Sequence, residues 1–162
     1  MRKLYIKQEI FKIEDHYSIF DEHENEVYKV DEIFRFFDKH YEITNLQTGD
    51  IIKVDKVFPV FLPQFEITFP NGKTLTLKSE FKLFKKKINV LPLEEKIHIE
   101  GNFLDYEFSI LKDEKVIGFI EKEVFRFSDT YSITVLDETY EELFIAMMIT
   151  IDHIKDMEES SR

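Results

Sequence analysis

Six lysines between residues 73 and 87 form the one cluster in this chain whose charge could bind a ligand. Only one glutamate accompanies them, although the net charge of the whole chain at pH 7 is −11. An ammonium group near an anionic membrane contributes about 1 kcal/mol of binding free energy. The pattern therefore predicts a surface for phospholipid headgroups, with these members: Lys73, Lys78, Lys82, Lys85, Lys86 and Lys87. The alternative is a structural role, because lysines commonly protect sheet edges and turns.

The five histidines are the residues that could bind a metal, but their spacing predicts no site. No pair lies at positions i and i+4 of a helix with a third ligand nearby. His98 and Glu100 alternate on one predicted strand and come closest to a ligand set. His153, next to Asp152, is expected at a rim of the fold, where its charge would vary with pH. The others are expected to be solvated or structural: His16, His23 and His40.

No catalytic arrangement can be argued from the sequence. The absence of cysteine excludes thiol nucleophiles and disulfides, and four glycines leave no phosphate-binding loop. Glu94 and Glu95 form a loop pair, while Asp21, Asp50 and Asp113 lie in predicted turns, where aspartate is common. We therefore expect a protein that is not an enzyme and uses no cofactor.

The distribution of charge and apolar residues bears on partners and compartment. A net charge of −11 opposes binding to nucleic acids. Residues 14–32 hold eight acids and one lysine, which favours a solvated face. The first residues lack the apolar run of a signal peptide, so the sequence predicts a cytoplasmic protein.

Residues 139–155 are predicted to form the single long helix. Thr139 and Glu142 have the spacing of a capping box. Between Glu142 and Asp152 the helix is apolar on all sides, which indicates burial. Those nine residues are too few for a membrane span, which needs about 20. The predicted core positions of the helix are Leu143, Phe144, Met147, Met148 and Ile151.

The remainder of the chain repeats one unit. Tyr17, Tyr41 and Phe65 each begin an aromatic-x-isoleucine pair, and successive units start 24 residues apart. Tyr106 and Tyr131 begin two further units. Each of the first four continues through a polar turn into a second alternating strand, which is the pattern of a β-hairpin.

Repeated hairpins predict a meander of roughly a dozen antiparallel strands. Closure of such a meander into a barrel removes its exposed edges. A barrel of about eight strands is already filled by its own side chains, so a wider one needs a plug. The apolar helix is the available plug. The sequence therefore predicts a mainly β protein, a closed barrel of about 12 strands enclosing a C-terminal helix, with one domain over residues 1–157 and a loose tail over 158–162.

The chain resembles the LURP-one-related family, in particular its short bacterial members, which share the Tubby C-terminal fold with phospholipid scramblases. The resemblance covers nearly the entire chain. Its segments are residues 4–13 (LYIKQEIFKI), 17–21 (YSIFD), 27–30 (VYKV), 58–63 (FPVFLP) before Phe65-Glu-Ile67, and the terminal helix. It implies the barrel fold and a binding role, and similarity to Tubby proteins implies basic surface residues that contact phosphoinositides. The palmitoylation of scramblases has no counterpart here, since cysteine is absent, and the sequence contains no acidic loop like that of an EF-hand to bind calcium.

Three functions are compatible with these observations. The first is a non-catalytic scaffold or binding barrel with an unknown protein partner. The second is a peripheral membrane tether that binds anionic phospholipids through the lysine cluster. The third is a carrier of a lipid or another small ligand inside the barrel.

Overall fold

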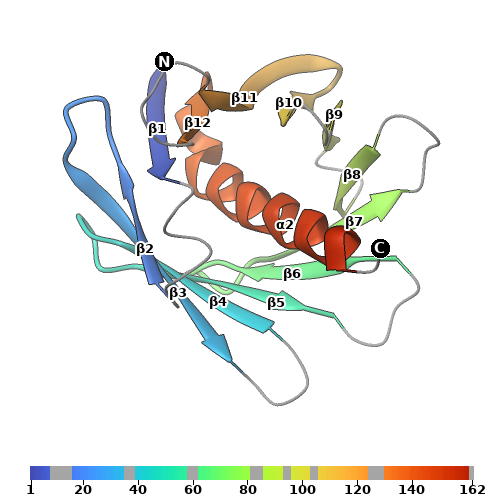
Figure 1. Ribbon diagram of the computed structural model, residues 1–162, viewed down its shortest axis with the longest axis horizontal. Coiled ribbons are helices and arrows are strands. Elements are labelled where there is room, and N and C mark those ends of the chain that lie inside the picture. The colour runs from blue at the N-terminus through green and yellow to red at the C-terminus, as the bar shows by residue number, and fades with distance from the viewer. Residues whose placement is uncertain are drawn as a thin grey trace.

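Twelve antiparallel strands form a closed barrel around one long helix in the computed structural model (Figure 1). The structure describes residues 1–7, 16–57 except 35–38, 62–92 except 81–85, 96–102, 106–123 and 130–160. The strands are β1 (Arg2–Lys7), β2 (His16–Phe20), β3 (Glu26–Phe34), β4 (Lys39–Asn45), β5 (Ile51–Lys56), β6 (Gln64–Thr68), β7 (Thr74–Glu80), β8 (Lys86–Leu91), β9 (Ile97–Asn102), β10 (Glu107–Lys112), β11 (Lys115–Glu123) and β12 (Thr130–Val135).

Neighbouring strands in the sequence are neighbours in the barrel, so the sheet is the predicted meander. The barrel closes where β1 pairs with β12 in antiparallel register, with Arg2 opposite Val135 and Lys7 opposite Thr130. Two features of the sequence lie outside the described residues. One is residues 10–13, whose alternation predicts a short strand, and the other is most of the phenylalanines with which the repeat units end in the sequence.

The repeated hairpins follow from alternation and turn chemistry. In β6 and β7, buried residues alternate with more exposed ones, so one face of each strand lines the barrel. Gly72 adopts a φ of +82° in the predicted Asn71-Gly72 turn. This left-handed conformation is readily available to glycine. Asp113 and Glu114 both have positive φ values between β10 and β11, as a two-residue hairpin turn of type I′ requires.

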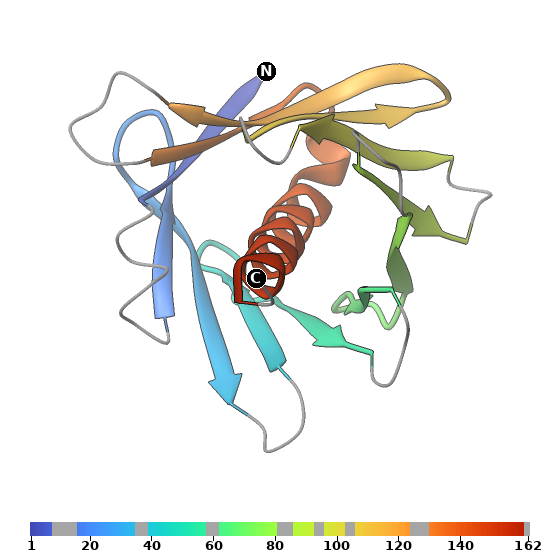
Figure 2. The ribbon, with the colours of Figure 1, turned by 45° about the vertical axis from the view of Figure 1, so that its right-hand side comes forward.

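The helix α2 (Glu141–Ser160) runs through the barrel, after a short 3-10 turn, η2 (Glu138–Tyr140). Figure 2 shows the strands arranged around it. All the predicted core positions of α2 are buried: Leu143, Phe144, Met147, Met148 and Ile151. The sequence assigns residues 158–162 to a loose tail, but α2 continues through residues 158–160. Near its end, Ser160 Oγ donates to the carbonyl oxygen of Asp156 at 2.9 Å.

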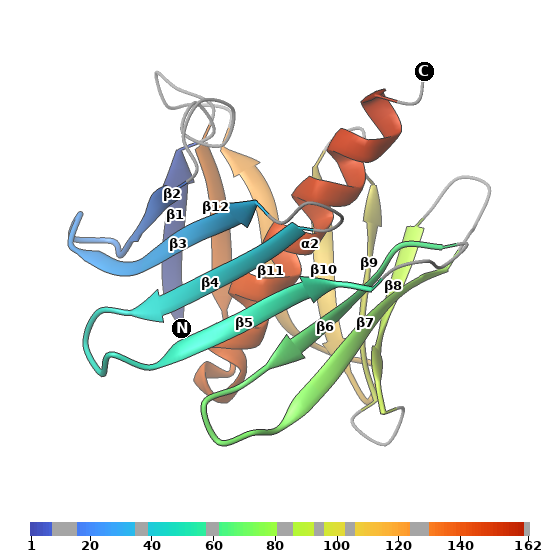
Figure 3. The ribbon, with the colours of Figure 1, turned by 90° about the horizontal axis from the view of Figure 1, so that it is seen from below.

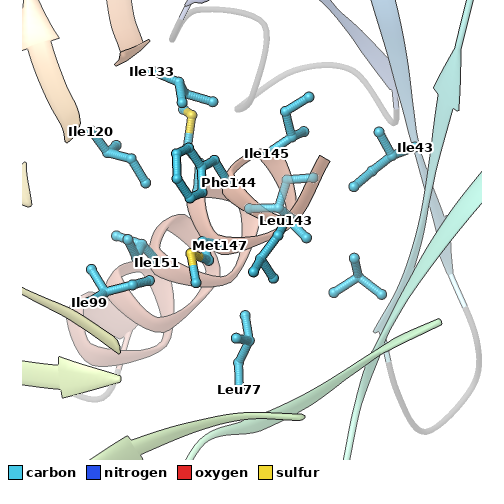
Figure 4. Close-up of a cluster of buried hydrophobic side chains, with 14 of the residues drawn as sticks. Ile43, Leu77, Ile99, Ile120, Ile133, Leu143, Phe144, Ile145, Met147 and Ile151 are labelled. Carbon is cyan, nitrogen blue, oxygen red and sulfur yellow. The ribbon is translucent and has the colours of Figure 1, made fainter. Parts of the chain in front are cut away.

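Side chains from the strands fill the space around the helix. Figure 4 shows Ile43, Leu77, Ile99 and Ile120 projecting from four different strands toward α2. Each of these side chains is at most 1% exposed. The inward faces of the strands and the surface of α2 therefore form one continuous apolar core, and the prediction that the helix fills the barrel is confirmed.

The barrel has two ends, which we name by the helix. The helix-start mouth contains η2 and the turns at residues 21–25, 46–50, 69–73 and 113–114. The helix-end mouth lies at the opposite end, where α2 reaches Ser160 (Figure 3). Within the described residues, no helix combines the length and hydropathy that a membrane span requires.

Candidate functional site

At the helix-start mouth, a buried carboxylate ties α2 to the barrel wall. Glu141 is 6% exposed, and its carboxylate accepts a hydrogen bond of 2.7 Å from the hydroxyl of Tyr28. Arg2 Nε lies 3.3 Å from the other carboxylate oxygen. A buried charge needs such partners, because leaving it unpaired costs several kcal/mol, about 3–5 when one partner is removed. These contacts fix the position of the first helical turn relative to β1 and β3.

The start of the helix differs in detail from the predicted capping box. Asp137 has an extended backbone (φ −119°, ψ 103°), and its carboxylate accepts from the amide of Thr139 at 3.2 Å. Thr139 therefore lies inside η2 and is not the cap. The carboxylate of Glu142 instead accepts from the side-chain amide of Asn45, with Nδ2 at 3.4 Å from Oε1. This leaves Glu142 at the mouth of the barrel, beside a cleft.

The cleft has a volume of about 470 Å³ and is built from three segments that are distant in sequence. The β4–β5 turn supplies Asp50, the β6–β7 hairpin supplies residues 69–75, and η2 with the first turn of α2 supplies residues 139–143. Its apolar lining residues are Phe69, Pro70, Leu75 and Leu143, and its polar ones are Asp50, Asn71, Lys73, Thr139, Tyr140 and Glu142.

The floor of the cleft is continuous with the barrel core. Leu75 and Leu143 belong to the core cluster, against which Phe69 and Tyr140 pack as partly buried residues. Tyr140 is held from the far side by Lys112, whose ammonium donates to the tyrosine hydroxyl and lies 4.7 Å from the ring centroid. An apolar group entering the cleft would therefore meet a preformed surface.

Exposed apolar side chains lie at the same mouth. Leu46 and Ile51 flank the β4–β5 turn and are 46% and 42% exposed. Leu136, between β12 and η2, is 44% exposed. These three side chains and the cleft place exposed apolar groups at the same end of the molecule.

A different polar group surrounds the last turns of α2, inside the helix-end mouth. The residues that begin the five repeat units are all buried there: Tyr17, Tyr41, Phe65, Tyr106 and Tyr131. Tyr106 donates to Asp152 at 3.1 Å, and its ring stacks on Tyr131 with centroids 4.2 Å apart. We call these five residues the aromatic belt.

His153 lies inside this belt and not at the rim where the sequence suggested. Its Nδ1 is 3.3 Å from the hydroxyl of Tyr41, and its ring meets that of Phe65 edge-on at 5.5 Å. Its buried Nε2 has no hydrogen-bond partner among the described residues. Burial, together with the charges of Lys39 and Lys56, lowers the pKa of His153 to about 4.

The tyrosine hydroxyls around α2 are also held neutral. Burial raises the pKa of Tyr17 and of Tyr106, and the charge of Asp152 raises both further. Burial and then Glu32 raise the pKa of Tyr41. Neutral hydroxyls and a neutral imidazole in an apolar core are suited to positioning the helix rather than to exchanging protons with a substrate.

Three members of the predicted lysine cluster have described side chains: Lys73, Lys78 and Lys87. Lys78 is exposed on β7, and Lys87 on β8 lies directly across from Glu80 on β7 and Glu100 on β9. Lys73 is in the β6–β7 turn, about 17 Å from Lys78 at 3.3 Å per residue. The remaining members lie outside the described side chains: Lys82, Lys85 and Lys86.

Two of the other histidines, His40 and His98, lie beside carboxylates. His40 is buried, with Nδ1 2.6 Å from Asp55 and Nε2 3.3 Å from Glu42. His98 Nε2 is 3.9 Å from Glu100. The alternation of His40 and Glu42 on one strand was a signal that sequence reasoning missed. The described residues contain no group of three or more His, Cys, Asp or Glu side chains that could hold a metal.

Comparisons with known proteins agree on the architecture. A family model described as LURP-one-related matches residues 2–152. An X-ray structure of a protein from Arabidopsis thaliana superposes with a TM-score of 0.64 at 12% sequence identity, covering 94% of this chain and 90% of the other. At this identity the likeness concerns the fold alone. A search of curated proteins gives no significant match.

Proposed function

Because the chain belongs to the LURP-one-related family and its barrel encloses its own helix, we propose that it is a non-catalytic binding protein or scaffold that meets partners with its outer surface. The observation that carries this proposal is the burial of α2, where every side chain from residue 143 to 151 is at most 3% exposed. The interior that a carrier protein would use for a ligand is occupied by the chain itself.

The chemistry of the polar groups supports binding over catalysis. The buried ones hold the helix in place, as Tyr28 does with Glu141 and Tyr106 with Asp152. A general acid or base needs a pKa near the working pH, and that of His153 lies at about 4. The surfaces that remain for a partner are the outside of the barrel and the cleft at the helix-start mouth.

The membrane tether and the ligand carrier are the competing functions. Binding to anionic phospholipid through the lysine cluster is weakened as a hypothesis by Glu80 and Glu100, which flank Lys87. Both carboxylates would repel a phosphate headgroup at that point. The tether hypothesis can be tested in the same experiment as the scaffold hypothesis.

The test is crosslinking of the tagged protein in cells of its source organism, followed by reconstitution with each purified candidate. A saturable complex between two purified proteins is the expected result.

Sedimentation with vesicles that contain or lack anionic lipid tests the membrane tether, using the wild type and a Lys78→Glu/Lys87→Glu variant. Vesicle binding that the variant loses would replace the scaffold with the tether. A co-purified lipid found by native mass spectrometry would favour the carrier.

A further inference from the structure

We propose that the cleft at the helix-start mouth binds a short basic segment of a protein partner, with one large apolar side chain on the cleft floor and a neighbouring Lys or Arg against Asp50 and Glu142. This inference rests on the proposed binding function and specifies the site and the chemical class of the partner.

The floor determines the apolar part of the partner. Phe69, Leu75 and Leu143 present carbon surface to a volume of about 470 Å³. Binding sites for small molecules and side chains fall in the range of about 300–1,000 Å³. A Leu, Met or Phe side chain in this space would contact the barrel core and be removed from water, which favours binding.

The rim determines the charge of the partner. Asp50 is exposed, and its carboxylate has no ion-pair or hydrogen-bond partner among the described residues. Glu142 has one long contact, 3.4 Å to Asn45. Further carboxylates surround this mouth and outnumber its cations, which are Arg2, Lys73, Lys96, Lys112 and Lys115. The carboxylates belong to Asp21, Glu22, Glu24, Asp113, Glu114, Asp137 and Glu138, and that of Asp113 pairs with Lys96. Such a field attracts a basic segment and repels an acidic one.

The cleft also offers a donor to the backbone of a peptide. Asn71 lines it, and its side-chain amide can donate to a backbone carbonyl group. Cationic side chains of the partner are expected to point toward Asp50 and Glu142, which also line the cleft.

Exposed apolar side chains near the cleft favour a peptide over a small molecule. Leu46 and Ile51 flank the turn that carries Asp50, and both are more than 40% exposed. A ligand that reaches from the cleft to these two side chains would be several residues long. In the closed order of the described strands each strand has a neighbour on both sides, so the segment binds through side chains and does not add a strand to the sheet.

The test is a selection from a library of random peptides of about a dozen residues, displayed on phage, against the immobilised wild-type protein. Enriched peptides are then synthesised, and their affinities are measured by fluorescence anisotropy. Two variants probe the cleft. Asp50→Lys reverses the charge of its rim, and Thr139→Trp fills it from an exposed position. Glu22→Lys is the matched control, since it makes the same charge change at the same mouth outside the cleft.

The expected peptides combine a large apolar residue with Lys or Arg. Their affinity should fall about tenfold or more with Asp50→Lys and with Thr139→Trp, and by less than about threefold with Glu22→Lys. It should also weaken as salt concentration rises, because exposed charges are screened.

Peptides that are acidic or uncharged, peptides whose affinity is unchanged by both cleft variants, or a selection without enrichment would overturn the cleft assignment. A different result would contradict the proposed binding function, namely crosslinking that yields no partner able to form a complex with the purified protein. If a reconstituted complex forms but is unaffected by Asp50→Lys and Thr139→Trp, the binding function stands and only the assignment of the cleft is wrong.

Discussion

The ring of Phe144 on α2 packs directly against Gly118 on β11. A Cβ atom built on Gly118 would lie 2.4 Å from Cε2 of Phe144 and 2.8 Å from the carbonyl oxygen of Thr134. Real Cβ atoms essentially never approach that closely. The missing side chain of Gly118 therefore makes the space in which the helix passes this strand.

Replacing Gly118 by alanine should destabilise the protein by about 1–3 kcal/mol, the usual range for overpacking a core. The measurement is urea denaturation. Phe144→Leu alone should also destabilise, because it removes buried carbon. The double variant should lose less unfolding free energy than the two single variants lose together, because the smaller leucine side chain leaves room for the new methyl group. Strict additivity would show that the two residues do not limit each other.

Met147→Asp should abolish folding. The side chain is fully buried, and an unpaired buried charge costs several kcal/mol against a total stability of about 5–15 kcal/mol. Circular dichroism and thermal melting give the readout. Met157→Asp is the control on the same helix, since Met157 is partly exposed and its sulfur accepts from Lys56 Nζ at 3.3 Å. A cooperative melt for Met147→Asp would contradict the buried helix.

The contact between Tyr28 and Glu141 should couple the helix start to β3. Tyr28→Phe removes the donor of the 2.7 Å hydrogen bond and should cost about 1–3 kcal/mol, the range for a hydrogen bond to a charged or otherwise unsatisfied group. In a Glu141→Gln background the same change should cost less. Chemical denaturation of the four proteins in the cycle provides the coupling energy, and a value near zero would mean that the hydroxyl does not anchor the helix.

Stability should fall as pH decreases from about 6.5 to about 4, with His153 as one cause. Its pKa is about 4 in the folded protein and 6.5 ordinarily, so the unfolded chain binds the proton first. The stabilising contribution is complete above pH 6.5 and is lost by about pH 4. At about 1.4 kcal/mol per pKa unit it amounts to about 3 kcal/mol. His153→Leu should flatten the difference in unfolding free energy between these pH values. A difference that is as large in His153→Leu as in the wild type would contradict this role of His153.

Alkaline titration should show that four buried tyrosines remain neutral until the protein unfolds. The folded protein should retain neutral hydroxyls at Tyr17, Tyr28, Tyr41 and Tyr106 well above pH 10, because burial raises the pKa of each. Tyrosinate absorbance at high pH should therefore rise in step with loss of the circular dichroism signal. Ionisation of all tyrosines before unfolding would show that water reaches the aromatic belt.

The barrel could be predicted because its signals are local. Alternation of buried and exposed residues identifies a strand within five or six positions, and residues 143–151 are apolar on every side of a helix. The aromatic-x-isoleucine pairs of the repeat also share one face of their strands, and in the first two units both members are buried: Tyr17 with Ile19, and Tyr41 with Ile43. What each hydroxyl meets depends on how far α2 is inserted along the barrel axis, and no local pattern encodes that distance.

The cleft could not be predicted, for a related reason. Asp50, Leu75 and Leu143 come together only through the closure of the barrel and the tilt of the helix, and nothing in their own segments marks them. The capping box failed because Asp137 and Thr139 are both good cap residues two positions apart. The extended backbone of Asp137 let it take the role, and the first turn became a 3-10 turn.

The pairing of Arg2 with Val135 sets a constraint on biosynthesis. During translation, β1 is synthesised long before its partner β12. The edge of β1 that pairs with β12 therefore stays unpaired until residues 130–135 have been added. The plug that completes the interior follows later still. The barrel consequently cannot close before β12 has been translated, and a contact so remote in sequence slows closure. Nascent chains of this protein would thus be natural clients for chaperones that shield aggregation-prone strands.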